Sequence, residues 1–524
     1  MKKLFKRDNI IYAFIFLIAF VAVARYLGYM LGTFASSTAV NAFNEYRDFP
    51  SIRISYAIMN GINPYTMEGM SSYNVPMLDL YSGLNPLLAA LLAKVARISI
   101  LWAYRLLNLV YIAGSTYALT RTMCEHSKRH VGVKIMFAFM MAVTSATIYS
   151  VAGYCLRPDA MGFCVYALLL MYLCREKKNV FMMSLLSILL FFTKQTMLVM
   201  VFPIFVWLLM YERRTAIRYL VSCLVGGALC VALLERFAPL YITSTVVGQY
   251  FSSSKDIFAH AIENFVLYMD AYKHLIIADI VMIALGIIFG RKSFLGLRKM
   301  TRAQKYIVLL VLNIIFAILA LCFVGRNGID GYKYCKEMLT PSLALLGIYF
   351  IETIPDDRRV IKSVCLHVST LLMSVATLML SRAFTMAIYY PENMESYRAL
   401  SRKLAQYETD EIYLGAASTA LALESDDLMQ NGWFTDGHMV CFVNECSFPV
   451  AYEDEKYQYM KSQNADYIYY VNEMVEDGDF EILCLDMNEE VINKDNLAKN
   501  YIETEHYSLA MDMGEWDVAV WEKK

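Results

Sequence analysis

Two candidate carboxylates lie near the start of a long loop, residues 33–98, between the first two apolar runs of this 524-residue chain. Glu45 and Asp48 belong to the sequence Glu-Tyr-Arg-Asp-Phe-Pro, and long loops between membrane helices usually carry function. A carboxylate held beside a hydroxyl group can act as its general base. Asp48 is the first candidate and Glu45 the second. The alternative is that Asp48 caps a helix beginning near Pro50, because Asp before Pro is common at helix starts.

Basic residues near the ends of later apolar runs could clamp a phosphate or only meet lipid head groups; they are Arg157, Lys194, Arg326, Lys333 and Lys336. Lys194 interrupts an apolar stretch, where an ionisable group is functional by default and snorkelling to the interface is the alternative. For Arg157 and Asp159 the alternative is helix-start chemistry, because Pro158 and a neighbouring carboxylate both favour a helix N-terminus.

Membrane helices must position these residues. The composition is 58% hydrophobic and 18% charged, which excludes an ordinary soluble chain of this length. The stretch 178–212 holds two short runs broken at Lys194, which predicts a hairpin of two spans or a re-entrant pair. Runs of about 20 residues, enough to cross the hydrocarbon core, occupy 10–32, 99–121, 132–153, 157–174, 214–234, 275–290, 306–324, 336–353 and 361–386. We therefore predict a polytopic α-helical membrane protein with about eleven transmembrane helices.

The charges of the short loops predict the orientation of the chain. Every second loop is rich in Lys and Arg, beginning with the N-terminal Met-Lys-Lys-Leu-Phe-Lys-Arg, and basic loops stay on the cytoplasmic side. The N-terminus is thus expected on the inner, cytoplasmic side of the plasma (cytoplasmic) membrane, with the first run as an uncleaved signal anchor. The segment 85–97 is apolar but interrupted by Lys94 and Arg97, so we expect an amphipathic helix in the outer interface rather than a span.

The sequence changes character at Pro391. Residues 391–524 hold 9 Lys and Arg against 29 Asp and Glu, whereas the preceding part holds 38 against 19. Apolar spans cease, and the patterns predict helices at 394–407 and 454–464 and strands at 411–414, 466–471 and 516–521, the last in a hairpin turning at Gly514. We expect a transmembrane module over 1–390 and an extracytoplasmic α/β domain over 391–524.

Several motifs follow one another over most of residues 10–390. The acidic loop is followed by Gly-Ile-Asn-Pro-Tyr at 61–65, Tyr-Ser-Gly-Leu-Asn-Pro at 81–86, Arg-Pro-Asp-Ala at 157–160, Lys-Gln-Thr at 194–196 and Gly-Arg-Asn at 325–327. In order and spacing they resemble the GT-C superfamily of membrane glycosyltransferases, which use polyprenyl-phosphate-linked sugars. The resemblance is closest to bacterial hexosyl- and mannosyltransferase-like proteins, with protein mannosyltransferases and aminoarabinose transferases more distant. The family often has adjacent Asp and Glu in this loop, whereas Glu45 and Asp48 are separated.

The resemblance implies transfer of a hexose from polyprenyl phosphate to a lipid-linked or cell-surface glycan on the outer face of the membrane. Phosphate leaves readily, so one general base and cations around the phosphate suffice, and direct displacement inverts the anomeric carbon. Asp48 or Glu45 would be the base. Asp159, Tyr65 and Tyr81 would contact substrate, and the donor phosphate would be held by Arg157, Lys194, Arg326, Lys333 and Lys336.

Two other classes compete with this interpretation. A lipid-linked oligosaccharide flippase, a polymerase or another transporter would favour internal repeats and broken midplane helices, and the sequence shows no repeat. A structural or accessory membrane protein is the third class. The expected partners are the polyprenyl-phosphate-linked sugar, a glycan or glycolipid acceptor and membrane lipids, without nucleic acid. The outer loops hold no Asp-x-Asp pair and the cysteines match no common zinc spacing, so we predict no metal and no cofactor.

Overall fold

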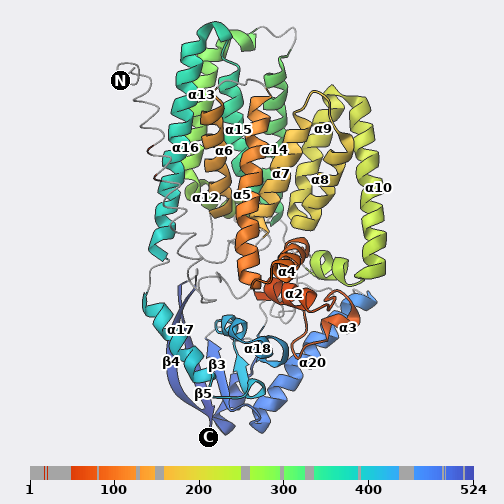
Figure 1. Ribbon diagram of the computed structural model, residues 1–524, viewed down its shortest axis with the longest axis vertical. Coiled ribbons are helices and arrows are strands. Elements are labelled where there is room, and N and C mark those ends of the chain that lie inside the picture. The colour runs from red at the N-terminus through yellow and green to blue at the C-terminus, as the bar shows by residue number, and fades with distance from the viewer. Residues whose placement is uncertain are drawn as a thin grey trace.

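The computed structural model consists of a bundle of long helices with a smaller α/β unit at one end (Figure 1). The candidate residues Glu45, Asp48, Tyr81, Arg157, Arg326 and Lys333 lie outside the residues that the structure describes, as does nearly all of the predicted first span at 10–32. The described residues are 49–78, 82–125, 130–147, 158–248, 260–295, 300–324, 336–387, 391–435, 454–486, 489, 491–511 and 514–524, with the isolated positions 17 and 21.

The helices of the bundle follow the apolar runs of the sequence, because a chain in lipid must satisfy its backbone groups internally. The stretch 178–212 forms two helices joined by a short 3-10 helix, η3 (Gln195–Met200), as expected for either a hairpin of two spans or a re-entrant pair. The bundle helices are α5 (Ile100–Cys124), α6 (Val131–Thr147), α7 (Asp159–Leu173), α8 (Val180–Thr193), α9 (Val201–Tyr211), α10 (Arg213–Phe237), α13 (Lys273–Leu295), α14 (Arg302–Val324), α15 (Lys336–Glu352) and α16 (Arg359–Ala387).

Among the described residues, four of these helices are long and apolar enough to cross a membrane alone: Arg213–Phe237, Lys273–Gly290, Arg302–Cys322 and Arg359–Thr377. Shorter apolar helices accompany them. The predicted count of about eleven spans includes the first run and therefore stays a prediction.

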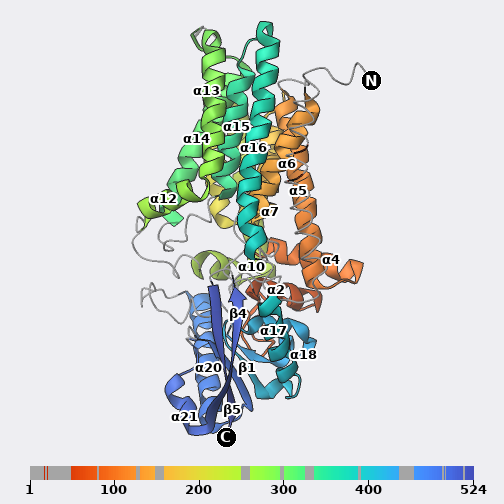
Figure 2. The ribbon, with the colours of Figure 1, turned by 90° about the vertical axis from the view of Figure 1, so that its left-hand side faces the viewer.

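The bundle has two distinct ends, which Figures 1 and 2 show from two sides. The end that faces the α/β unit is called the near end, and the opposite end the far end. Across the near end lie α2 (Phe49–Met59), α3 (Met67–Met70) and α4 (Leu84–Ala96). The axes of α4 and α5 meet at 112°, so α4 lies across the bundle as predicted for an interfacial helix, and Arg97 in the left-handed conformation ends it.

The α/β unit contains a five-stranded sheet in the order β2-β1-β3-β5-β4. β1 (Ile412–Leu414) lies parallel to both β2 (Trp433–Phe434) and β3 (Ile482–Asp486), and β5 (Gly514–Lys523) runs antiparallel to β3 and β4 (Tyr501–Met511). Its helices include α17 (Pro391–Leu404), α18 (Asp426–Asn431), α20 (Glu455–Asp477) and α21 (Leu497–Asn500). The predicted α/β fold and the hairpin pairing Met511 with Gly514 are confirmed.

The strand predicted at 466–471 was wrong, because this segment lies inside α20. The side chain of Asp454 accepts a hydrogen bond from the amide of Tyr457 and caps the helix, which ends at Gly478 with φ 74°. Its buried side chains recur every three or four residues from Tyr457 to Val475, which is a helical period. The strand β3 was missed because all five of its residues are buried, so it lacks the alternation of a half-exposed strand.

Candidate functional site

Asp159 and Lys194 form a buried ion pair at the near end, with the Lys194 Nζ 2.8 Å from the Asp159 Oδ1. Asp159 is the first residue of α7 and follows Pro158. Lys194 is in an extended conformation between the end of α8 and η3. Because a buried charge is costly unless it is paired, each of these groups stabilises the other in its charged form.

The backbone break at Lys194 is held by its neighbours on both sides. The Gln195 side-chain amide donates to the carbonyl of Thr245, 2.9 Å away, in the π-helical turn η4 (Thr243–Gly248). At Gly162 on α7, an added Cβ would lie 2.6 Å from the Met197 sulfur, so a larger residue there would displace the Met197 side chain of η3. The Lys194 ammonium therefore has a defined position relative to α7.

The structure brings together two of the predicted site residues, Asp159 and Lys194, although they are 35 residues apart in the chain. The Lys194 side chain is buried within the protein, so it does not extend to the interface as the snorkelling alternative required. Lys336 begins α15, which packs against α7. The sequence singled out each residue of the pair, but nothing in it indicated that they were partners.

The Gly-Ile-Asn-Pro-Tyr motif fixes the first loop to the end of α10. The Asn63 side-chain amide donates to the carbonyl of Phe237 at 2.6 Å, and the Leu240 amide donates to the carbonyl of Tyr65 at 2.9 Å. The rings of Tyr65 and Tyr241 meet edge to face at 4.9 Å. Tyr65 is buried here and packs the loop, and its contact with substrate stays a prediction. The role of Asn63 was not recognised from the sequence, although it lies in the quoted motif.

The α/β unit holds α2 in place through Phe434 of β2. The Phe434 ring lies 5.2 Å from the ring of Phe49 in an edge-to-face arrangement, and the Arg53 guanidinium lies 4.7 Å from its centroid. Arg53 also donates to the carbonyls of Val75 at 2.5 Å and Pro76 at 3.3 Å. Sequence analysis missed this contact, because it joins segments almost four hundred residues apart in the chain.

The contact through Phe434 bears on Asp48, which immediately precedes Phe49 in the sequence. The structure describes α2 from Phe49 onward, so the two roles predicted for Asp48, general base and helix cap, both stay predictions. Within the described part of the chain no three His, Cys, Asp or Glu side chains lie close enough to hold a metal ion.

No protein-family model and no curated protein sequence matches the chain, whereas solved structures do. ArnT from Cupriavidus metallidurans bound to undecaprenyl phosphate superposes over 97% of this chain and 98% of its own, with a TM-score of 0.55 and 12% identity. The apo structure of the same protein gives 0.50 and 13% over the same shares. The arabinofuranosyltransferase AftD from mycobacteria gives 0.40 and 11% over 96% of this chain and 40% of its own. The chain thus has the fold of ArnT along nearly its whole length, and the predicted fold class, a GT-C-like helical bundle with a C-terminal α/β unit, is confirmed.

Proposed function

We propose that this protein is an inverting glycosyltransferase that moves a hexose from a polyprenyl-phosphate donor to a lipid-linked or cell-surface glycan. The observation that carries the proposal is the buried pair of Asp159 and Lys194 at the near end, in a fold shared along nearly the whole chain with ArnT. The ArnT structure holds undecaprenyl phosphate, a lipid phosphate of the kind that Lys194 would bind here.

The reaction needs one proton acceptor and a site for the departing phosphate. The acceptor hydroxyl attacks the anomeric carbon and gives its proton to Asp48 or Glu45. The electrons of the breaking carbon–oxygen bond leave with the lipid phosphate. Asp159 keeps the Lys194 ammonium charged and oriented, and this ammonium donates to the phosphate together with Arg157, Arg326, Lys333 and Lys336. Tyr65 and Tyr81 complete the substrate contacts.

The proposed site faces the outside of the plasma (cytoplasmic) membrane. The helices α6, α8, α10, α14 and α16 begin at the far end (Figure 1), and basic residues lie at or next to these starts: Lys134, Lys178, Arg213, Arg302 and Arg358. Basic ends stay in the cytoplasm. The first loop and the domain 391–524 would then both be extracytoplasmic, following a transmembrane module over 1–390. Introduced cysteines test this orientation in a background without the twelve native cysteines. Asn60→Cys should react with an impermeant reagent from outside and Met300→Cys should not; the reverse pattern would overturn the orientation.

The decisive experiment supplies the purified protein with radiolabelled polyprenyl-phosphate sugars and glycan acceptors. We expect one donor to lose its sugar to an acceptor with release of the lipid phosphate. In proteoliposomes, a label that crosses the bilayer while still attached to its lipid would instead favour the flippase.

Lys194→Met tests the phosphate site directly. Turnover should fall about 10- to 150-fold, because a charge-assisted hydrogen bond contributes about 1.5–3 kcal/mol. Since the single change leaves Asp159 buried without this partner, it should also lower stability. The double variant Asp159→Asn/Lys194→Met removes both charges, and we expect it to recover stability but not turnover.

A matched control separates the site from the general cost of removing a buried lysine. The Lys178 side chain is 8% exposed, as is that of Lys194, and it is paired with Glu212 at 2.5 Å at the far end. Lys178→Met should leave the turnover of folded protein unchanged. An equal loss of turnover in both variants would remove Lys194 from the phosphate site.

A further inference from the structure

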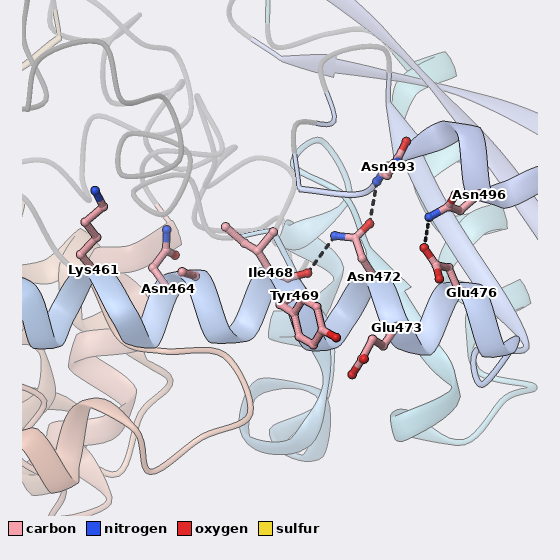
Figure 3. A pocket seen from close by; sticks show the side chains of 10 residues that line it. Lys461, Asn464, Ile468, Tyr469, Asn472, Glu473, Glu476, Asn493 and Asn496 are labelled. Atoms are coloured by element: carbon pink, nitrogen blue, oxygen red, sulfur yellow. Dashed lines mark hydrogen bonds between the residues drawn. The ribbon is translucent and has the colours of Figure 1, made fainter. Parts of the chain in front are cut away.

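A polar groove of about 580 Å³ runs along one face of α20 in the α/β unit (Figure 3). Eight of its ten lining residues belong to this helix, from Lys461 to Glu476, at the spacing of one helical face. The other two, Asn493 and Asn496, come from the segment before α21. The groove lies outside the proposed transfer site, and neither the fold nor the proposed reaction has so far given it a role.

Hydrogen bonds hold the two walls of the groove together. The Asn472 amide donates to the carbonyls of Ile468 at 2.8 Å and Val491 at 2.9 Å, and its oxygen accepts from the Asn493 amide at 2.7 Å. Further along, the Asn496 side chain donates to the carboxylate of Glu476. The walls are therefore positioned before a ligand arrives, which lowers the entropy cost of binding.

The described lining favours a ligand with many hydroxyl groups. Carboxamides such as those of Asn493 and Asn496 have both donor and acceptor atoms, as does a sugar hydroxyl. The Tyr469 side chain is 66% exposed, so its ring can cover the apolar face of a sugar ring. Glu473 follows Tyr469 by about one turn on the groove face of α20, and its hydrogen bond with the Tyr469 hydroxyl raises the pKa of that hydroxyl.

Charge and polarity disfavour the other ligand classes. Lys461 is the one basic residue in the described lining, against the carboxylates of Glu473 and Glu476, so a polyphosphate or nucleic acid would be repelled. A lipid acyl chain needs a continuous apolar surface, whereas eight of the ten lining residues have polar side chains.

The groove starts where α20 meets the first loop. The Tyr459 hydroxyl donates to the carbonyl of Met67 at 2.9 Å, and the Ser71 hydroxyl donates to the side chain of Gln463 at 2.7 Å. From there α20 runs away from the bundle (Figure 1). The fifteen steps from Lys461 to Glu476 correspond to about 22 Å at 1.5 Å per residue, which accommodates several sugar residues in a row.

We propose that this groove binds the growing end of a neutral oligosaccharide acceptor and directs it toward the first loop. The inference rests on the proposed transferase function and deepens it by assigning the acceptor class and its binding surface. Tyr469 stacks on a sugar ring, and Asn493, Asn496 and Glu473 bond to its hydroxyls.

The test is direct binding to the full chain in phospholipid nanodiscs, which avoids sugar-based detergents and needs no donor lipid. The probes are neutral hexasaccharides of mannose, glucose or galactose, measured by calorimetric titration. We expect at least one to bind, and Tyr469→Ala to weaken it about tenfold, the size expected for loss of an aromatic contact. Tyr470→Ala is the matched control, because Tyr470 is 51% exposed on the same helix and does not line the groove.

The outcomes separate the groove from the transferase proposal. Tyr469-dependent binding by a protein that transfers no sugar from any donor would support the groove and remove the proposed function. Failure of all three hexasaccharides to bind, or equal binding by wild type and Tyr469→Ala, would overturn the groove assignment whether or not transfer is observed. Tyr469-dependent binding of a neutral peptide in place of the saccharides would overturn the ligand class.

Discussion

The two ends of the helix bundle both bury a lysine against a carboxylate, but they do so in different surroundings. At the far end, Glu352 of α15 accepts from Lys134 of α6 and Lys362 of α16, each at 2.9 Å. Those lysines also donate to the backbone carbonyls of Met123 and of Glu352 itself. They thereby provide hydrogen-bond donors for carbonyls in the last turns of α5 and α15, which have no partner within the helix. The far-end cluster therefore ties regular helix ends together.

At the near end, the pair of Asp159 and Lys194 lies at a break in the backbone rather than in a regular last turn. It is also close to the first loop, which the Gly-Ile-Asn-Pro-Tyr motif and Phe434 hold against the bundle. Burial and charge pairing alone thus do not distinguish a functional pair from a structural one. The irregular backbone and the adjacent loop favour function for the near-end pair.

Asp48→Asn tests the comparison with the largest expected effect. A general base contributes about 10²–10⁴-fold to rate, so turnover should fall by that factor. Donor binding should survive, because loss of a negative charge cannot weaken attraction to a phosphate. Asn caps a helix nearly as well as Asp, so the helix-cap role predicts turnover close to wild type. A steady-state loss of less than about threefold, far below a base's contribution, would move the assignment to Glu45, with Glu45→Gln as the next variant.

A second prediction concerns the pH dependence of the α/β unit, which contacts the near end. Burial, with a smaller effect of nearby Asp486, raises the pKa of Glu489 to about 7 from its ordinary 4.5. The folded unit then binds more protons than the unfolded chain between these values, so its stability is full below pH 4.5 and falls as pH rises through 7. The loss should be roughly 3 kcal/mol.

Hydrogen exchange of β1 and β3 amides at pH 5 and pH 8, corrected for intrinsic rates, measures this loss. Glu489 accepts from the hydroxyl of Thr435 at 2.8 Å, and Thr435 follows Phe434, so the titrating group lies next to the contact with α2. Glu489→Gln should flatten the pH dependence, whereas Glu455→Gln, at an exposed position in the first turn of α20, should leave it intact. An unchanged pH dependence in Glu489→Gln would assign it to another group.

Lys134→Met tests whether the far-end cluster is only structural. Removing this lysine takes away a charge-assisted contact and leaves Glu352 with Lys362, so we expect a loss of about 2 kcal/mol in the free energy of unfolding. Turnover per folded molecule should not change. The measurement is thermal unfolding in detergent alongside the transferase assay. A loss of turnover as large as that of Lys194→Met would show that the two ends do not differ in function.

The smallest predicted effect comes from Phe434→Leu, which removes part of the contact between the α/β unit and α2. The change keeps an apolar side chain but removes the ring that lies between Phe49 and Arg53. We expect turnover to fall about tenfold, as a small misplacement of a catalytic loop can cost that or more, with little change in donor binding. Gln430→Ala, which removes only the 3.0 Å hydrogen bond to Tyr56, is the milder control. Equal turnover in Phe434→Leu and wild type would show that α2 holds its place without the ring.

The sequence predicted the bundle better than the α/β unit, for a physical reason. Lipid requires long apolar helices, so the runs at 99–121 and 214–234 correspond closely to α5 and α10. In water the same residues can suit either structure: Tyr467 to Val471 has strand-forming side chains yet lies in α20 because of its cap and its buried face. Of the candidate site, Lys194 was found as a charge in apolar surroundings and Asp159 as the carboxylate beside Pro158 at the start of an apolar run. Their pairing depends on the packing of α7 against α8, which local patterns do not encode.

The perpendicular orientation of α4 has a consequence for the bilayer itself. Leu87, Leu91 and Val95 form an exposed apolar stripe on this helix, which meets α5 at 112°. A helix that lies flat in one leaflet takes up area there and none in the other, so the two leaflets must accommodate different cross-sections of the same protein. α4 therefore gives the protein a wedge shape that is wider in the leaflet that holds this helix. Its incorporation should favour membranes in which that leaflet is on the convex side, where its lipids are less tightly packed.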